Sequence, residues 1–291
     1  MVISNVFSKS VNYLLYVMLF NGITTAPLDT SKVDLAEALQ ISNDATPGFT
    51  TFNTPRFTLY IGDSGDSEIT PKELSSIATK AIKALDKSYV EVNQLFGIEL
   101  KDKVEVRLLS VEEFKSRTGA PEWTNAMYYR GEISIPVRRK YINNNEELFR
   151  TIKHEYIHAV TSKLTDYKCP AWIDEGIAQY FEGKENSLIA PALRKWTRKN
   201  SLVPLNTLKD GFMGFDSDVV PVIYGESLYV TKYLIDRYGM QNVTSFLKLI
   251  GEGKSDEEAF IQTFKLSYRD LETILGTKIK IWSEGNKKIM G

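Results

Sequence analysis

Apolar residues recur along this chain at helical spacing in long segments and at strand spacing in a few short ones. The pattern predicts a helix from Pro71 to about Leu95, because Thr70 can cap its start and Gly97 can end it. A short helix is expected to start within 110–114. Strand composition or alternation marks three further segments: Phe57–Ile61, Val104–Leu109, and Asn125–Pro136 with a bend or bulge at Gly131.

From Asn145 onward the pattern is helical. Hardly any strand is indicated there apart from short apolar runs such as 219–223. Asn145 is expected to cap a helix to about Leu164, and Ser255–Glu258 forms a capping box. The predicted fold is therefore α+β, with a strand-containing front and a helical back. We divide the chain into a leader (1–26), a polar linker or arm (27–54), an α/β subdomain (55–144) and a helical subdomain (145–291), the last two forming one unit.

Charge gives no sign of a nucleic-acid partner, because 36 Lys and Arg residues nearly balance 37 Asp and Glu residues. The single cysteine, Cys169, has no partner for an internal disulfide and is interpreted as a small core residue.

The N-terminus resembles a secretory signal, since Lys9 precedes an apolar stretch from Val11 to Ile23 that is followed by small residues. We therefore expect a secreted or extracytoplasmic protein. An uncleaved membrane anchor, or a core helix of a cytoplasmic protein, is the alternative.

The run His154-Glu155-Tyr156-Ile157-His158 contains both histidines of the chain. Residues four apart on a helix lie one turn apart, so the two imidazoles can bind one zinc ion, with Glu155 beside it as a base. A catalytic zinc site takes a third protein ligand, and a carboxylate is expected here. The segment 170–181 begins with proline and could present Glu175 toward the histidines, with the neighbouring Asp174 as the competing carboxylate.

His154-Glu155-x-x-His158 followed by Pro170-x-Trp172-x-x-Glu175-Gly176-x-Ala178 resembles the gluzincin peptidases, particularly the bacterial peptidase-MA-like group. Residues 224–239 are similar to the Tyr-x-x-Ser helix of that family and its Tyr-Gly end. The resemblance implies a thermolysin-like catalytic domain, in which a small mixed sheet packs on zinc-binding helices. It also implies that Glu175 is the third ligand of one zinc ion.

The activity implied is hydrolysis of polypeptides by a metal-activated water, with Glu155 as general base and then acid. Tyr224 is the candidate oxyanion donor, although packing is the usual role of tyrosine. Gln179, one turn after Glu175, is the candidate partner that orients a zinc-bound histidine. The segment Asn125-Ala126-Met127 is similar to the strand along which gluzincins hold substrate. Aminopeptidases of this clan carry a glutamate at the next position, where this sequence has Tyr128, and this difference favours an endopeptidase.

Three other interpretations compete with this one. Gly62-Asp63-Ser64-Gly65 resembles a serine-protease nucleophile segment, but both histidines lie in the zinc motif. The basic segments 138–140 and 194–199 are interpreted as solvated surface rather than nucleic-acid contacts. A binding or structural module that keeps a peptidase fold is the alternative function, and the retained Glu155 argues against it. The substrate side-chain preference and the oligomeric state have no signal in the sequence.

Overall fold

The computed structural model of the protein describes residues 49–62, 69–120, 124–129, 131–285 and 287–290. Five strands form one mixed sheet in the order β1-β2-β3-β5-β4. Strands β2, β3 and β5 run parallel, and β1 and β4 pair antiparallel at the two edges. The strands are β1 (Phe49–Asn53), β2 (Phe57–Gly62), β3 (Val104–Leu109), β4 (Met127–Tyr129) and β5 (Glu132–Pro136).

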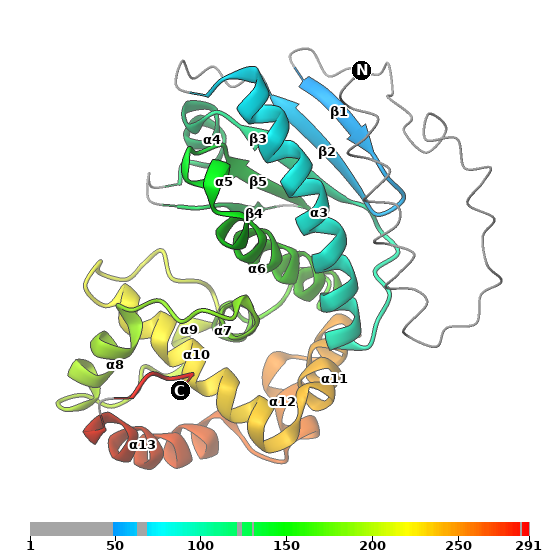
Figure 1. The fold of residues 1–291 in the computed structure, drawn as a ribbon. Helices are drawn as coiled ribbons and strands as arrows, with labels where there is room; N and C mark the ends of the chain where they lie inside the picture. Colours follow the sequence, from blue (N-terminus) through cyan, green and yellow to red (C-terminus); the bar gives the residue numbers. More distant parts are fainter. Residues whose placement is uncertain (1–48, 63–68, 121–123, 130, 286, 291) are drawn as a thin grey trace.

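Helices make up most of the rest of the described chain. Figure 1 shows the sheet and α3 in the upper half of the molecule and most other helices in the lower half, and α6 lies between the two halves. Helix α3 packs against α6, which packs in turn on α7, and α7 packs on α10. The helices are α3 (Pro71–Phe96), α4 (Val111–Thr118), α5 (Lys140–Asn143), α6 (Asn145–Leu164), α7 (Ala171–Glu182), α8 (Ile189–Thr197), α9 (Leu205–Leu208), α10 (Val220–Tyr238), α11 (Met240–Gly251), α12 (Asp256–Phe264) and α13 (Tyr268–Glu284).

Local capping explains why the helix ends agree well with the sequence pattern. Thr70 and Glu73 form a capping box at the start of α3, and Gly97 ends this helix in the left-handed conformation (φ 60°). Ser255 and Glu258 form the predicted box at α12. These contacts lie within a few residues of each other along the chain, so the sequence alone predicts them.

A single buried core joins the sheet to the helices. It takes Leu59, Val106 and Ile133 from the strands, Ile77 from α3, and further buried residues from the helical part, such as Ile152, Val160, Ile177 and Phe246. The mixed sheet and the α+β class agree with the prediction, and the shared core is continuous between the front and back parts.

Four local predictions need correction. The expected linker up to residue 54 ends too late, because 49–53 form β1, whose backbone pairs with β2. The segment 125–136 is a hairpin of β4 and β5 rather than one bent strand, and Gly131 (φ 91°) takes a turn conformation that favours glycine. The cap of α6 is Asn144, one residue earlier than expected. The apolar run 219–223 forms the N-cap and first turn of α10 rather than a strand, and packing of this helix buries Val222 and Ile223.

The leader and most of the expected arm lie outside the described residues, as do residues 63–65 of the segment that begins at Gly62. In the part of the chain that is described, no helix has the length and apolar character needed to cross a membrane.

Candidate metal centre and active site

The two histidines lie on the side of α6 that faces α7. Buried residues of α6 such as Leu148, Ile152 and Val160 pack into the core, and this packing fixes the rotation of the helix about its axis. His154 and His158 are one turn apart, with ring centroids separated by 4.9 Å. The helix alone therefore brings two imidazoles together.

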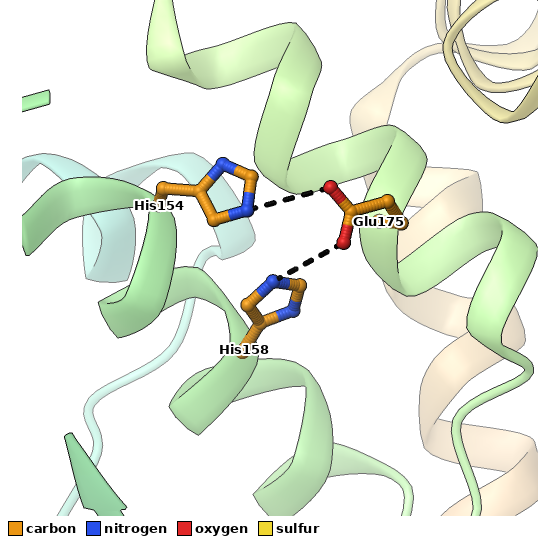
Figure 2. A group of neighbouring side chains, drawn as sticks. All are labelled: His154, His158 and Glu175. Atoms are coloured by element: carbon orange, nitrogen blue, oxygen red, sulfur yellow. Dashed lines mark ion pairs between the residues drawn. The ribbon is translucent and has the colours of Figure 1, made fainter. Parts of the chain in front are cut away.

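Glu175 on α7 supplies the third donor and faces both rings (Figure 2). Its Oε1 lies 3.5 Å from His154 Nε2, and its Oε2 lies 3.6 Å from His158 Nε2. One ligand atom from each of the three residues lies within 4.8 Å of the other two. The three predicted ligands therefore converge, although they come from two helices.

These separations fit a bound zinc ion. Two ligand atoms at about 2.0–2.1 Å from one tetrahedral ion are separated by about 3.4 Å. Each histidine nitrogen lies at a distance close to this value from one oxygen of Glu175, 3.5 Å from Oε1 for His154 and 3.6 Å from Oε2 for His158. Two imidazoles and one carboxylate are also a ligand set of catalytic zinc sites.

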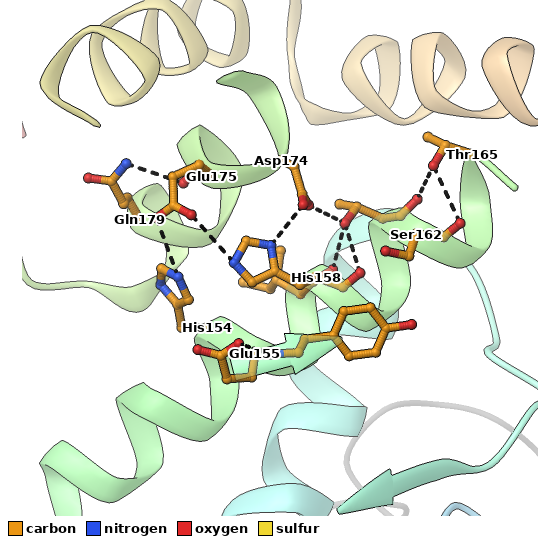
Figure 3. Close-up of polar contacts among 11 residues, drawn as sticks. His154, Glu155, His158, Ser162, Thr165, Asp174, Glu175 and Gln179 are labelled. Atoms are coloured by element: carbon orange, nitrogen blue, oxygen red, sulfur yellow. Dashed lines mark hydrogen bonds and ion pairs between the residues drawn. The ribbon is translucent and has the colours of Figure 1, made fainter. Parts of the chain in front are cut away.

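The outer nitrogens of both histidines face carboxylates, and Figure 3 shows the contact between His158 and Asp174. His158 Nδ1 lies 3.0 Å from Asp174 Oδ2, and the other oxygen of Asp174 accepts a hydrogen bond from the Thr161 hydroxyl. Asp174, the competing ligand candidate, therefore contacts the ring nitrogen that points away from Glu175. It can hold the ring and its tautomer while Nε2 remains available for a metal.

The partner of His154 is Glu182, which the sequence interpretation missed. His154 Nδ1 lies 3.3 Å from Glu182 Oε2, and Glu182 Oε1 lies 3.7 Å from Arg150 Nη1. Glu182 follows Glu175 by seven residues, which places both on one face of α7, and Arg150 precedes His154 by one turn on α6. This spacing is the signal by which the pair could have been found.

Gln179 does not take the predicted role of orienting a histidine. Its Nε2 donates to the backbone carbonyls of Tyr224 (3.1 Å) and Glu175 (3.4 Å). It is turned toward α10, because a residue four positions after Glu175 is rotated around the helix axis away from Glu182. Its contacts tie α7 to the second turn of α10.

Glu155 lies beside the three candidate ligands and is buried, with 7% of its surface exposed. Its Oε2 accepts a hydrogen bond of 2.7 Å from the backbone N–H of Tyr128 on β4. Burial raises the pKa of Glu155 above its usual value, although the neighbouring histidines oppose the rise. The bond to Tyr128 orients the carboxylate from the edge strand.

The charges of the cluster are mutually dependent. Burial lowers the pKa of His158, but Asp174 outweighs burial and raises this pKa to about 9. Burial also opposes the charge of His154, and Glu175 and Glu182 nevertheless raise its pKa well above the usual value. A metal must displace these protons before it binds, so metal affinity should depend on pH.

Tyr224 begins the second turn of α10 and is half-buried near the cluster. Burial raises the pKa of its phenol above the usual value, and the carboxylates of Glu175 and Glu155 raise it further. The hydroxyl therefore stays protonated and can act as a hydrogen-bond donor. Its ring packs against Phe212, with centroids 5.1 Å apart.

The predicted substrate strand is shorter than expected at its start. Asn125 and Ala126 precede β4, which begins at Met127. The side chain of Asn125 accepts a hydrogen bond from Lys140 Nζ (2.6 Å), and its carbonyl accepts one from the Tyr141 hydroxyl (3.2 Å). Asn125 therefore anchors the approach to β4, and the edge of the sheet is formed by 127–129.

Gly176 explains why a glycine follows the third ligand. A Cβ at this position would lie 2.1 Å from Thr231 Oγ1 and 2.4 Å from the carbonyl oxygen of Ser227, both on α10. Helices α7 and α10 can approach this closely only because residue 176 has no side chain. The close contact sets the position of Glu175, its neighbour.

The basic segments make contacts within the chain. Arg138 donates to the Thr124 carbonyl, and Lys140 contacts Asn125 and Glu147. Arg194 donates to the Lys287 carbonyl and lies over the Trp282 ring. These contacts agree with the interpretation of both segments as ordinary surface.

Comparison with protein families decides the wider relationship. The model of the Peptidase MA superfamily matches residues 84–280. The chain belongs to the Peptidase MA superfamily. The matched region contains α6, α7 and α10, and so all three candidate ligands of this Peptidase MA protein. No curated protein matches the sequence.

Proposed function

We propose that this member of the Peptidase MA superfamily is a zinc-dependent endopeptidase. His154, His158 and Glu175 bind one zinc ion, and Glu155 is the general base. The observation that carries the proposal is the convergence of three ligand atoms within 4.8 Å beside a buried carboxylate that is turned toward the same site.

When bound, the zinc ion supplies Lewis acidity that polarises the scissile carbonyl and makes water acidic enough to be deprotonated near neutral pH. Glu155 accepts the proton of the attacking water at its carboxylate. One oxygen of Glu155 is held by the Tyr128 N–H, so the other is available for this proton. The same group then passes the proton to the leaving amine, and the carboxylate is regenerated.

Tyr224 supplies a hydrogen bond to the oxygen that becomes negative during attack. Its raised pKa keeps the phenol protonated at neutral pH. A donor placed before the reaction stabilises the developing charge without reorganisation. Asp174 and Glu182 hold the two imidazole rings in place from their outer nitrogens.

Strand β4 provides the edge along which an extended substrate binds. In an antiparallel pair the N–H and C=O of one residue point to the same side. The N–H of Tyr128 points to Glu155, away from β5, so its carbonyl also faces the open edge. This carbonyl can accept a hydrogen bond from a substrate N–H.

The same strand favours internal cleavage. An aminopeptidase needs an acidic group near the edge strand to hold the free amino terminus of its substrate. The residue at the corresponding position is Tyr128, whose phenol carries no charge at neutral pH, and burial raises its pKa further above the ordinary value of about 10. A chain that continues in both directions is therefore the preferred substrate.

Two substitutions test the proposal together with a matched control. We expect purified wild-type protein to contain one zinc ion per chain and to hydrolyse an unfolded, dye-quenched protein. Glu155→Gln should keep the zinc ion and lose at least about 100-fold in rate. Glu175→Gln should lose zinc and activity together. Glu146→Gln, which changes an exposed carboxylate on the same helix α6, should match the wild type.

A binding module with a peptidase fold would give a different result. Its zinc content would be complete, no polypeptide would be cleaved, and Glu155→Gln would behave as the wild type. That combination would refute the peptidase proposal.

A further inference from the structure

The segment between α9 and α10 lies beside the proposed active site and carries a fully exposed methionine. Among the described residues, large exposed apolar side chains are few, and half of them belong to segments next to the site: β4, the turn between α6 and α7, and the segment 209–219. The exposed residues are Tyr129, Tyr167, Leu188, Met213, Ile261 and Ile281. Met213 is the most exposed of them.

Both ends of the segment 209–219 are tied to helices of the site. The carbonyl of Lys209 accepts a hydrogen bond of 2.9 Å from the N–H of Ala171, the first residue of α7. At the other end, the carbonyl of Asp216 accepts bonds from the N–H groups of Val219 (2.9 Å) and Val220 (3.2 Å), where α10 begins. The segment is therefore positioned by the helices that carry Glu175 and Tyr224.

Met213 lies at the tip of a turn that is held by its flanking aromatic residues. The N–H of Phe215 donates to the carbonyl of Phe212 (3.4 Å), and both rings are half-buried against the main core. Gly211 has φ of 110°, a conformation that favours glycine and directs the chain into the turn. The rings of Phe212 and Phe215 therefore pack on the core, whereas the side chain of Met213 between them is exposed to solvent.

The turn is adjacent to the proposed catalytic machinery, since the Phe212 ring packs on the Tyr224 ring at a centroid distance of 5.1 Å. The turn and β4 both contact proposed catalytic residues, since the N–H of Tyr128 on β4 donates to Glu155 and the Phe212 ring packs on Tyr224. A substrate extended along β4 through the site would therefore come next to the turn.

We propose that Met213 is a specificity-determining residue that packs against a large apolar side chain of the polypeptide substrate. The inference rests on the proposed peptidase function and adds the substrate class: polypeptides with a bulky aliphatic or aromatic residue near the scissile bond. Methionine suits this role because its unbranched, polarisable side chain adapts to differently shaped apolar partners. The exposed Tyr129 on β4 adds apolar surface on the strand side.

The acidic residues around the turn offer the opposite specificity. Asp210, Asp216 and Asp218 are exposed within the same segment and could favour lysine or arginine in the substrate. None of the three adjoins Phe212 along the chain, whereas Met213 follows Phe212 directly, and the Phe212 ring contacts Tyr224. We therefore expect the apolar contact to dominate near the scissile bond.

The test uses full-length zinc-loaded protein and fluorogenic octapeptides that carry Leu, Ser or Lys at one position in turn. Wild-type protein should prefer Leu at one position. Met213→Ser should lower the Leu-to-Ser ratio of kcat/KM at that position by about tenfold, and Met213→Leu should restore it. Ile281→Ser, a change of an equally apolar exposed residue on α13, should keep the wild-type ratio. A Lys preference, or a Leu-to-Ser ratio unaffected by Met213→Ser, would overturn the inference.

A binding measurement separates this inference from the proposed function. Fluorescence anisotropy of labelled Leu and Ser peptides is measured with Glu155→Gln protein, with and without Met213→Ser. Leu-selective binding that requires Met213, without hydrolysis by the wild type, would uphold the inference and refute the peptidase proposal. Hydrolysis with no role for Met213 would refute the inference alone. A protein that neither binds nor cleaves any peptide would refute both.

Discussion

Substitution of Gly176 by alanine tests whether the close contact between α7 and α10 positions the metal ligand. The added Cβ would lie 2.1 Å from Thr231 Oγ1 and 2.4 Å from the Ser227 carbonyl oxygen. Thr231 can rotate its side chain, but the carbonyl belongs to the backbone of α10. The two helices must therefore separate by roughly 1 Å to reach an ordinary van der Waals distance.

Two effects of opposite sign determine the stability change. Alanine is favoured over glycine inside a helix by about 1 kcal/mol. Overpacking of a tight core costs typically about 1–3 kcal/mol, and a clash with backbone belongs at the upper end. We expect a net loss of about 2 kcal/mol in the free energy of unfolding of the metal-free protein.

The same shift should weaken metal binding, because Glu175 moves with its neighbour. A displacement of roughly 1 Å is large against the tolerance of about 0.2 Å for a ligand distance. We expect zinc affinity, measured by competition with a chromogenic chelator, to fall by at least about tenfold. Urea unfolding monitored by circular dichroism gives the stability.

Gly276→Ala is the matched control. This glycine lies inside α13, and an added Cβ would meet no atom within 4 Å. Alanine there should stabilise the protein by up to about 1 kcal/mol and leave zinc affinity unchanged. Equal stability and equal zinc affinity of the two alanine variants would refute the packing argument.

Three further outcomes follow from contacts of single side chains. Glu182→Gln should weaken zinc binding by about tenfold, because the ring of His154 loses its charged partner; an unchanged chelator competition would exclude that role. Tyr224→Phe should lower kcat by about 100-fold with normal zinc content, and a normal kcat would remove the phenol from the mechanism. Glu226 is fully buried, and burial raises its pKa to about 8, while its Oε2 accepts the Val203 N–H (2.9 Å). Between the ordinary pKa of a glutamate and about 8, Glu226 is therefore protonated in the folded protein and ionised in the unfolded chain. Its contribution to the free energy of unfolding is present at low pH and is lost as the pH rises toward 8. Between pH 5 and pH 8, the loss of stability in urea unfolding should be roughly 3 kcal/mol smaller for Glu226→Gln than for the wild type, and identical pH profiles would contradict this.

The helical part of the site could be predicted because its geometry is local. Two histidines four residues apart converge wherever they lie on a regular helix, and Glu155 follows the first of them directly. The starts of α3 and α12 depend on capping boxes formed by residues three positions apart, so the sequence pattern also predicts them. Glu175 required more than local geometry, and its resemblance to a family motif supplied the prediction.

Contacts between distant segments were decided only by the tertiary structure. The choice between Gln179 and Glu182 as the partner of His154 depends on how α7 is rotated against α6, and Gly176 controls that packing through α10. Residues 49–53, which include Phe49 and Phe52, form an edge strand because β2 is available to pair with them. The sequence by itself determined helices α3 and α12 with their caps and the histidine pair on α6, because each depends on neighbours along the chain. Only the fold decided which carboxylate holds each ring, because these contacts join residues that are far apart in sequence.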